Sequence, residues 1–188
     1  MKQIDTLVEI CIQKDYVSQD EAPWLRYALE RRITSLIAFV PLLIIGFLIT
    51  NPANLLAFLI TFFSLRTRTN GFHAKSVGRC LLYSILEKIF FLRFPPTVWN
   101  DIIAFIALVV SIVLIWLFAP YDHPNMDLSS EEKTACAKST KWRLSMLIFA
   151  LSVLYVWKQY QLALGIHLGV VMTASTLAMA YCSQKTMQ

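Results

Sequence analysis

The sequence predicts an all-α, polytopic membrane protein, and both its composition and the distribution of its charges support this prediction. Hydrophobic residues make up 57% of the 188 residues, charged residues only 15%, and the mean hydropathy is +0.57. A soluble domain of this length carries more charge. Several stretches contain no Asp, Glu, Lys, Arg or His, the longest being residues 33–65. We expect one membrane-embedded domain, residues 1–188, in which N-terminal amphipathic helices precede about six membrane-embedded helices, two of them short or marginal.

Two cytoplasmic amphipathic helices are expected within residues 1–32. The apolar residues of the first are spaced so that they share one helical face: Ile4, Leu7, Val8, Cys11 and Ile12. Ser18 and Glu21 fit a capping box, the pattern that begins a helix. A second helix should therefore start near Gln19 and continue directly into the membrane.

The segment 33–65 is too long to cross a membrane once. At about 1.5 Å per residue it would be about 50 Å long, whereas a hydrocarbon core is about 30 Å thick. Asn51-Pro52 is a turn signal near its middle, so we predict a helical hairpin. Its second arm, 54–65, is short, and a re-entrant or tilted arm is the alternative to a full crossing.

Four more membrane helices are expected within residues 81–182, namely 81–94, 102–119, 142–157 and 162–182. A cytoplasmic loop, 120–142, should separate the middle two. The first of the four is marginal because it contains Glu87 and Lys88. These two residues either line a polar groove beside Cys80 or mark a helix that lies near the membrane interface.

The basic residues give the chain an orientation. With a cytoplasmic N-terminus and six crossings, 14 of the 17 Lys and Arg residues are cytoplasmic, Arg93 and Lys158 lie opposite, and Lys88 lies within a span. An excess of Lys and Arg is typical of cytoplasmic loops. Four crossings fit less well, because loss of both marginal segments would move the basic segment 66–79 to the outside.

His73 and Cys80 are the strongest candidates for chemistry, within a segment, 66–80, that we expect to be a catalytic cytoplasmic loop. They are seven residues apart, which corresponds to about 10.5 Å along a straight helix. A general base must approach its nucleophile to about 3 Å. A Cys–His pair therefore requires the chain to fold back, and Asn70-Gly71 and Gly78 provide flexible points for such a turn.

The surroundings of Cys80 favour its thiolate. We expect a folded-back loop from Arg66 to Gly78 and place Cys80 in the first turn of the following helix, where the helix dipole stabilises an anion. Nearby basic residues act in the same direction, and no carboxylate opposes them before Glu87: Arg66, Arg68, Lys75 and Arg79. The alternative is that Cys80 is a packing residue beside an ordinary basic loop.

The other cysteines and histidines are weaker candidates. Cys11 and Cys182 are expected to be packing residues, and Cys136 lies among lysines with no histidine nearby. Asp122-His123 suggests a metal site, but a turn between prolines is the better interpretation. His167, inside an apolar helix, is expected to be a buried, hydrogen-bonded residue. We predict no metal site and no cofactor.

The stretch RTRTNGFHAKSVGRC resembles the signature of the accessory gene regulator B (AgrB) family of quorum-sensing peptidases through Arg66, Gly71, His73 and Cys80. The resemblance extends to the helical N-terminus, the hairpin and a later cytoplasmic segment that begins with Ala119-Pro120. The chain departs from the family pattern in Asn70, where glycine is frequent, and in Asp127, where proline is common.

The resemblance implies that His73 and Cys80 are the catalytic pair of a membrane cysteine endopeptidase. Such an enzyme would remove the C-terminal tail of a precursor peptide through a Cys80 acyl-enzyme and close the remainder to a thiolactone or lactone. The implied partners are an AgrD-like precursor with an amphipathic N-terminus and an acidic tail, the lipid membrane and a second copy of the chain, but no nucleic acid. Substrate binding or structural support is expected from Arg66, Asn70, Gly71, Lys75, Arg79, Lys138 and Lys141.

Two non-enzymatic functions are alternatives: a transporter whose polar loop gates a path, or a scaffold that binds an acidic peptide partner. A transporter of this kind would place ionisable residues on several facing helices, and few lie within the expected spans. A scaffold has no need of an activated thiol, so selective alkylation of Cys80 would argue against it.

Overall fold

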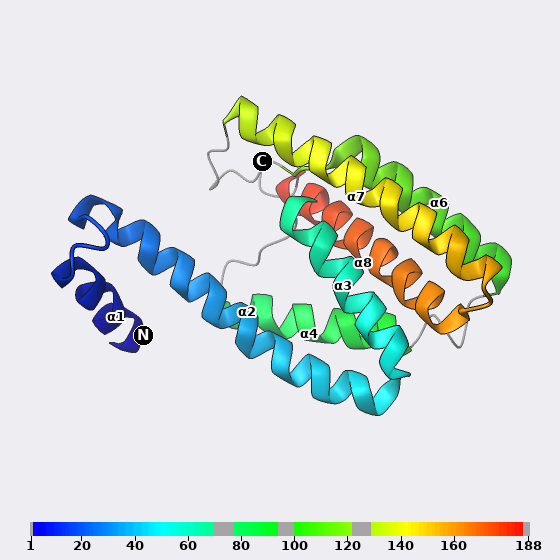
Figure 1. Cartoon of the computed structure of the whole chain (residues 1–188), viewed down its shortest axis with the longest axis horizontal. Helices are drawn as coiled ribbons and strands as arrows, with labels where there is room; N and C mark the ends of the chain where they lie inside the picture. Colours follow the sequence, from blue (N-terminus) through cyan, green and yellow to red (C-terminus); the bar gives the residue numbers. More distant parts are fainter. Residues whose placement is uncertain (1, 70–76, 94–99, 122–128, 186–188) are drawn as a thin grey trace.

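The computed structural model describes residues 2–69, 77–93, 100–121 and 129–185. Within these ranges the regular structure is helical and no strand occurs, which confirms the all-α prediction. The elements, arranged in space as Figure 1 shows, are α1 (Lys2–Gln13), the 3-10 helix η1 (Gln19–Glu21), α2 (Ala22–Ile49), α3 (Pro52–Thr69), α4 (Val77–Arg93), α6 (Asp101–Phe118), α7 (Ser130–Val156) and α8 (Tyr160–Lys185).

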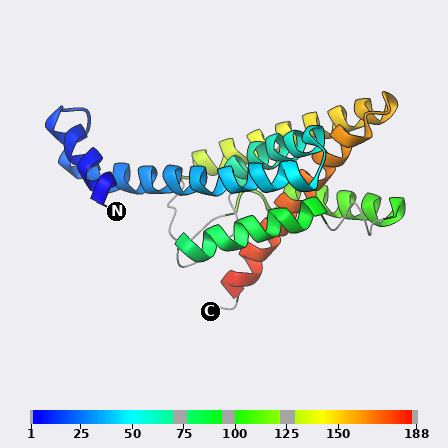
Figure 2. The ribbon, with the colours of Figure 1, turned by 90° about the horizontal axis from the view of Figure 1, so that it is seen from below.

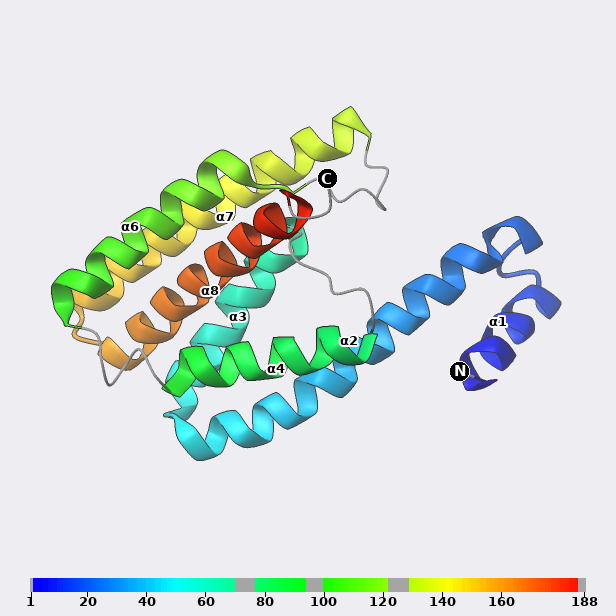
Figure 3. The same ribbon diagram turned by 180° about the vertical axis from the view of Figure 1, so that it is seen from behind.

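Helix α8 is the centre of the bundle. It contacts α3, α4, α6 and α7, and Figures 1 and 3 show it between α7 and α3. Leu168 and Met172 of α8 are fully buried and pack against Phe58 and Phe62 of α3. The main apolar core therefore lies where these two helices cross.

Two glycines allow α3 and α8 to approach each other closely. A Cβ atom on Gly165 would meet the carbonyl oxygen of Asn54 and lie 2.7 Å from the Cβ of Ala57, and one on Gly169 would lie 2.8 Å from the Cβ of Thr61. These neighbours are backbone or short side chains, which cannot move aside. The Gly165-x-x-x-Gly169 spacing is the small-residue pattern by which membrane helices bring their backbones together.

The predicted hairpin is confirmed. Helix α2 ends at Ile49 and α3 begins at Pro52. The side-chain oxygen of Asn51 accepts from the backbone N–H of Ala53 at 2.9 Å and so caps the start of α3. At its other end α3 continues through Thr69, so Arg66 lies in a helix and not in the loop that we expected to begin there.

The N-terminal helices form an arm that projects from the bundle (Figures 1 and 2). Helix α1 buries Ile4 and Val8, and its Asp5 pairs with Arg26 of α2 at 3.0 Å. The predicted capping box is present, since the backbone N–H of Ser18 donates to the Glu21 carboxylate at 3.2 Å. Helix α2 then runs without interruption into the hairpin, as predicted.

Two of the described helices are long and apolar enough to cross a membrane. They are α6, over Asp101–Phe118, and the part of α8 over Tyr160–Ser183. Helix α6 exposes large apolar side chains along its length, with Ile102 70% and Leu117 67% exposed, whereas α8 is mostly buried within the bundle. An uncovered apolar helix of this length is typical of contact with lipid.

Helix α7 differs most from expectation. The segment 120–142, predicted to be a loop, is helical from Ser130 onward and is continuous with the apolar helix that follows. The Ser129 hydroxyl accepts from the backbone N–H of Glu132 at 3.2 Å, and the Glu132 carboxylate accepts from the backbone N–H of Ser129 at 2.9 Å. This capping box is readable in the sequence as Ser-x-x-Glu and marks the true start of the helix.

Replacing Gly165 by alanine should destabilise the protein more than replacing Gly46. The new methyl group at 165 meets backbone, at an expected cost of about 1 to 3 kcal/mol, whereas at 46 it meets only the flexible end of Leu55, and the better helix propensity of alanine offsets part of the strain. Thermal unfolding in detergent gives the melting temperatures of the two variants. Equal melting temperatures for G165A and G46A would show that the close approach of α3 and α8 has no energetic importance.

Candidate functional site

The described helices flank the predicted catalytic segment on both sides. Helix α3 ends at Thr69, four residues before His73, and α4 begins at Val77, four residues after it. His73 lies outside the described residues, as do Asn70, Gly71 and Lys75. The structure therefore describes the two helix ends that flank this segment, namely the end of α3 and the start of α4.

Cys80 is the fourth residue of α4, so its predicted position in the first turn of a helix is confirmed. The backbone N–H groups of a first turn have no partner within the helix, and the dipole places partial positive charge there. A thiolate is stabilised at such a position. Gly78, which we expected to be a flexible point outside the helix, is itself helical.

The end of α3 is held by two segments that are distant in sequence. Arg143 of α7 donates through Nη1 to the carbonyl oxygen of Ser64, and to Oγ1 of Thr67 at 3.2 Å. The backbone N–H of Tyr121, which follows α6, donates to the carbonyl oxygen of Thr69 at 2.9 Å. The last carbonyl groups of a helix, that of Thr69 among them, have no partner within it, so the Tyr121 bond satisfies the end of α3. The Arg143 bonds attach the turn before this end to α7.

Tyr121 is in turn fixed by α8. It is 4% exposed and packs with Leu177 and Ala180. Its ring centroid lies 5.0 Å from that of Tyr181 in an edge-to-face contact. The hydroxyl of Tyr181 donates to the carbonyl oxygen of Phe118 at 3.0 Å. The end of α3 is thus connected to the C-terminal part of α8.

A polar cluster joins α3, α4 and α8 within the bundle. The Ser175 hydroxyl of α8 donates to the Glu87 carboxylate of α4 at 2.9 Å. Lys88 is only 5% exposed, with its Nζ 4.8 Å from the ring centroid of Phe62. Lys88 is thus buried and Glu87 is bonded to α8, so both residues contribute to the packed interior of the bundle.

The remaining candidates are spread through the fold. Cys11 and Cys136 are half-buried, and Cys182 is exposed, so the prediction that Cys182 is a packing residue is wrong. His167 is buried in α8, as predicted. Asp122-His123 lies outside the described residues.

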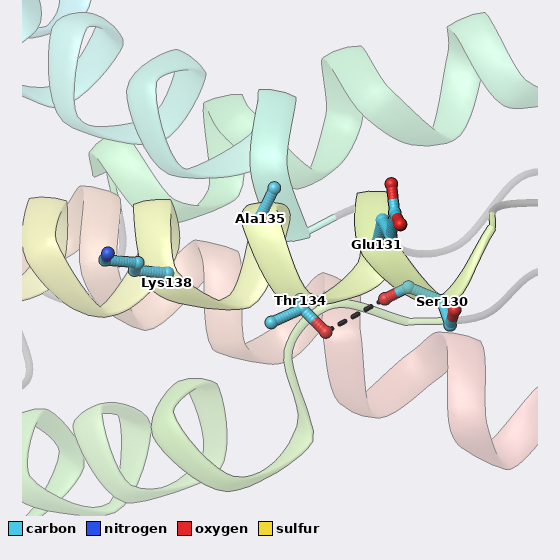
Figure 4. Close-up of a pocket in the computed structure, with 5 residues that line it drawn as sticks. All are labelled: Ser130, Glu131, Thr134, Ala135 and Lys138. Atoms are coloured by element: carbon cyan, nitrogen blue, oxygen red, sulfur yellow. Dashed lines mark hydrogen bonds between the residues drawn. The ribbon is translucent and has the colours of Figure 1, made fainter.

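Two of the basic residues predicted to bind substrate, Lys138 and Lys141, lie on α7. Lys138 is exposed, and with four residues of the first turns of α7 it lines a hollow that Figure 4 shows, beside Ser130, Glu131, Thr134 and Ala135. Lys141 is also exposed, and its Nζ lies 5.3 Å from the ring centroid of Trp116 on α6. Both lysines are therefore accessible to an acidic partner.

Sequence reasoning missed the residues that fix this arrangement. The sequence pattern singled out none of Arg143, Tyr121 and Ser175. No local pattern identifies these residues, because their partners are 79, 52 and 88 positions away. Gly165 and Gly169 could have been found from their spacing in an apolar helix.

Comparison with known proteins gives one family and no solved structure. The family model described as "Accessory gene regulator B" matches residues 4–177. The chain is 27% identical over 169 residues to a "Putative AgrB-like protein" of Clostridium perfringens (strain SM101 / Type A), covering 81% of this chain and 79% of the relative. It is 25% identical over 144 residues to "Putative AgrB-like protein 2" of Clostridium perfringens (strain 13 / Type A), covering 72% and 67%. No solved structure matches.

Replacing Ser175 by alanine should destabilise the bundle. The change removes a hydroxyl donor from a half-buried carboxylate, at an expected cost of about 1 to 3 kcal/mol. Ser152→Ala is the matched control, because that hydroxyl is exposed and bonds only within its own helix, so its effect should stay within about 0.5 kcal/mol. Thermal unfolding of both variants tests this, and an equal loss in the two would contradict a structural role for the Ser175–Glu87 bond.

The start of α7 should unwind in acid. Hydrogen bonds from the backbone N–H and the side chain of Ser129 hold the pKa of Glu132 below its ordinary value. The stabilisation is therefore complete above the unfolded pKa of about 4.3 and is lost as the pH falls through the lower folded pKa. Amide hydrogen exchange of residues 129–136, corrected for the intrinsic rate, should accelerate in this window. In Glu132→Gln the exchange rate should change less over the same pH range. If the variant and the wild-type protein had the same pH dependence of exchange, the stabilisation could not be assigned to the Glu132 carboxylate.

Proposed function

Because the chain belongs to the accessory gene regulator B (AgrB) family, we propose that it is a membrane cysteine endopeptidase that processes a quorum-sensing precursor peptide. It removes the C-terminal tail of an AgrD-like precursor and closes the remaining peptide to a thiolactone or lactone ring. The observation that supports this proposal most directly is the position of Cys80 in the first turn of α4. That position favours a thiolate, which is the reactive form of cysteine.

The charge pattern around Cys80 supports the same assignment. No Asp or Glu occurs between Arg31 and Leu86, so no nearby carboxylate in the sequence disfavours a thiolate. Lys75 and Arg79 add positive charge close to Cys80 in sequence, and Arg66 adds more from the last turn of α3. We assign Cys80 as the nucleophile and His73 as its general base.

In the cleavage step, His73 takes the proton of the Cys80 thiol and the thiolate attacks a backbone carbonyl carbon of the precursor. The C–S bond forms, and the peptide C–N bond breaks as the tetrahedral intermediate collapses. The imidazolium of His73 returns its proton to the leaving amine, which departs as the new N-terminus of the tail. The rest of the precursor remains attached to Cys80 as a thioester.

In the cyclisation step, a cysteine within the attached peptide attacks the thioester carbonyl carbon. Its thiolate forms the new C–S bond, the bond to Cys80 breaks, and the ring leaves while Cys80 is regenerated. One thioester replaces another, so the activated acyl group is conserved. A serine hydroxyl would give a lactone in the same way. Water must be kept away during this step, because hydrolysis of the thioester would release a linear product.

The supporting residues have separate roles in this proposal. Arg66 stabilises either the oxyanion or the carboxylate-rich tail, while Asn70 and Gly71 shape the turn that brings His73 to Cys80. Acidic groups of the tail bind basic residues at the cytoplasmic face: Lys75, Arg79, Lys138 and Lys141.

The family and the two apolar helices indicate a membrane protein. We propose six crossings, a cytoplasmic N-terminus and a homodimeric state. Six crossings place 14 of the 17 Lys and Arg residues on the cytoplasmic side, in accord with the positive-inside rule. A ribosome-made precursor reaches the enzyme from that side.

Cys80→Ala and His73→Ala should each abolish precursor cleavage without preventing membrane insertion, because each removes one half of the catalytic pair. Cys136→Ala and Cys182→Ala are the matched controls and should retain activity within about twofold, since surface substitutions usually have small effects. Mass spectrometry of the products after co-expression with the precursor measures the result. Normal processing by either the Cys80 or the His73 variant would refute the proposed mechanism and leave a transporter or scaffold function.

A further inference from the structure

Arg143 differs from Lys138 and Lys141, two other basic residues of α7, in what it contacts. Lys138 and Lys141 are exposed, whereas Arg143 is half-buried and donates to two groups on α3. Both acceptors belong to the last turns of that helix: the carbonyl oxygen of Ser64 and the hydroxyl of Thr67. A guanidinium near a helix C-terminus also compensates the partial negative charge that collects there.

The turn that Arg143 holds is the turn that contains Arg66. Ser64 and Thr67 lie on either side of Arg66 in sequence. At about 100° per residue, Ser64 and Thr67 lie about 60° apart around α3, whereas Arg66 lies about 160° from Ser64 and about 100° from Thr67. Arg143 therefore helps to fix the rotation of the turn that carries Arg66.

A second hydrogen bond also attaches the end of α3 to the rest of the bundle. Thr69, the last residue of α3, is fully buried, and its carbonyl oxygen accepts from the backbone N–H of Tyr121. The two attachments lie on successive turns, one from α7 and the other from the chain that follows α6. Together they determine both the direction and the end point of α3.

We propose that Arg143 is a positioning residue for the reaction of Cys80, acting through the last turns of α3. The inference rests on the proposed function. Arg143 touches no reacting atom in this account; it holds the last turns of α3, which carry Arg66, a residue that stabilises the oxyanion in the proposed mechanism. Loss of this hold should lower the rate of the chemical step and leave precursor affinity nearly unchanged, because misplacement by about 1 Å can reduce catalysis by about a hundredfold.

The test compares kcat and KM for precursor cleavage by the full-length protein reconstituted in vesicles. Arg143→Gln should lower kcat by about tenfold to a hundredfold and change KM by less than about threefold, and Arg143→Lys should recover part of the loss because it keeps a cationic donor. Lys133→Gln removes the same charge from the same helix and should alter neither constant. Thr67→Val removes only one of the two acceptors of Arg143 and should lower kcat by less than Arg143→Gln does. Thr67→Ser keeps the hydroxyl group and should retain kcat.

Hydrogen exchange of the peptide covering residues 60–69 supplies a readout independent of catalysis. Arg143→Gln should accelerate exchange at the end of α3, and Lys133→Gln should not. If the wild-type protein cleaves no precursor, the proposed function is wrong. The exchange experiment still tests whether Arg143 stabilises the end of α3. An unchanged kcat for Arg143→Gln in an active protein, an equal fall for Lys133→Gln, or unchanged exchange would overturn the assignment of Arg143.

Discussion

The close packing of α3 against α8 at Gly165 and Gly169 is the contact on which the rest of the structure depends. A methyl group at either glycine would meet the backbone or a short side chain of α3, so the separation of the two helices is fixed within narrow limits. The same α8 then supplies Ser175, which bonds Glu87 of α4, and Tyr181, which packs on Tyr121. Through these contacts one central helix fixes both helices that flank the predicted catalytic segment.

This architecture gives the polar residues of the core a consistent explanation. Charged groups inside a bundle are costly unless they are paired or hydrogen-bonded. Glu87 and Lys88 are neighbours on α4 that serve different partners: one accepts from Ser175, and the other lies over the ring of Phe62. Both residues lie on α4, whose first turn contains the proposed nucleophile Cys80. The membrane and the packed bundle would limit the access of water to a thioester intermediate.

How far the sequence predicts this structure depends on whether the signal is local. The hairpin turn at Asn51-Pro52 and the start of α4 before Cys80 follow from residues that are adjacent in sequence, and both were predicted. The helical start of α7 was missed although Ser129 and Glu132 give the same local signal as Ser18 and Glu21, because the surrounding lysines and prolines resemble a loop. The bonds of Arg143 and Tyr121 to α3 join distant segments, and no pattern in a single sequence reveals such pairs. The role of His73 remains a prediction, since it lies outside the described residues.

The central claim is that Cys80 becomes acylated by the precursor. Intact-protein mass spectrometry after mixing with a precursor whose ring-closing cysteine is replaced by alanine tests it most directly, because the acyl-enzyme then has no internal thiol to release it. The account predicts a mass increase equal to the precursor without its tail, located on Cys80 by peptide mapping and reversed by hydroxylamine. An adduct on Cys136 or Cys182, or no adduct under conditions in which the unaltered precursor is processed, would contradict it.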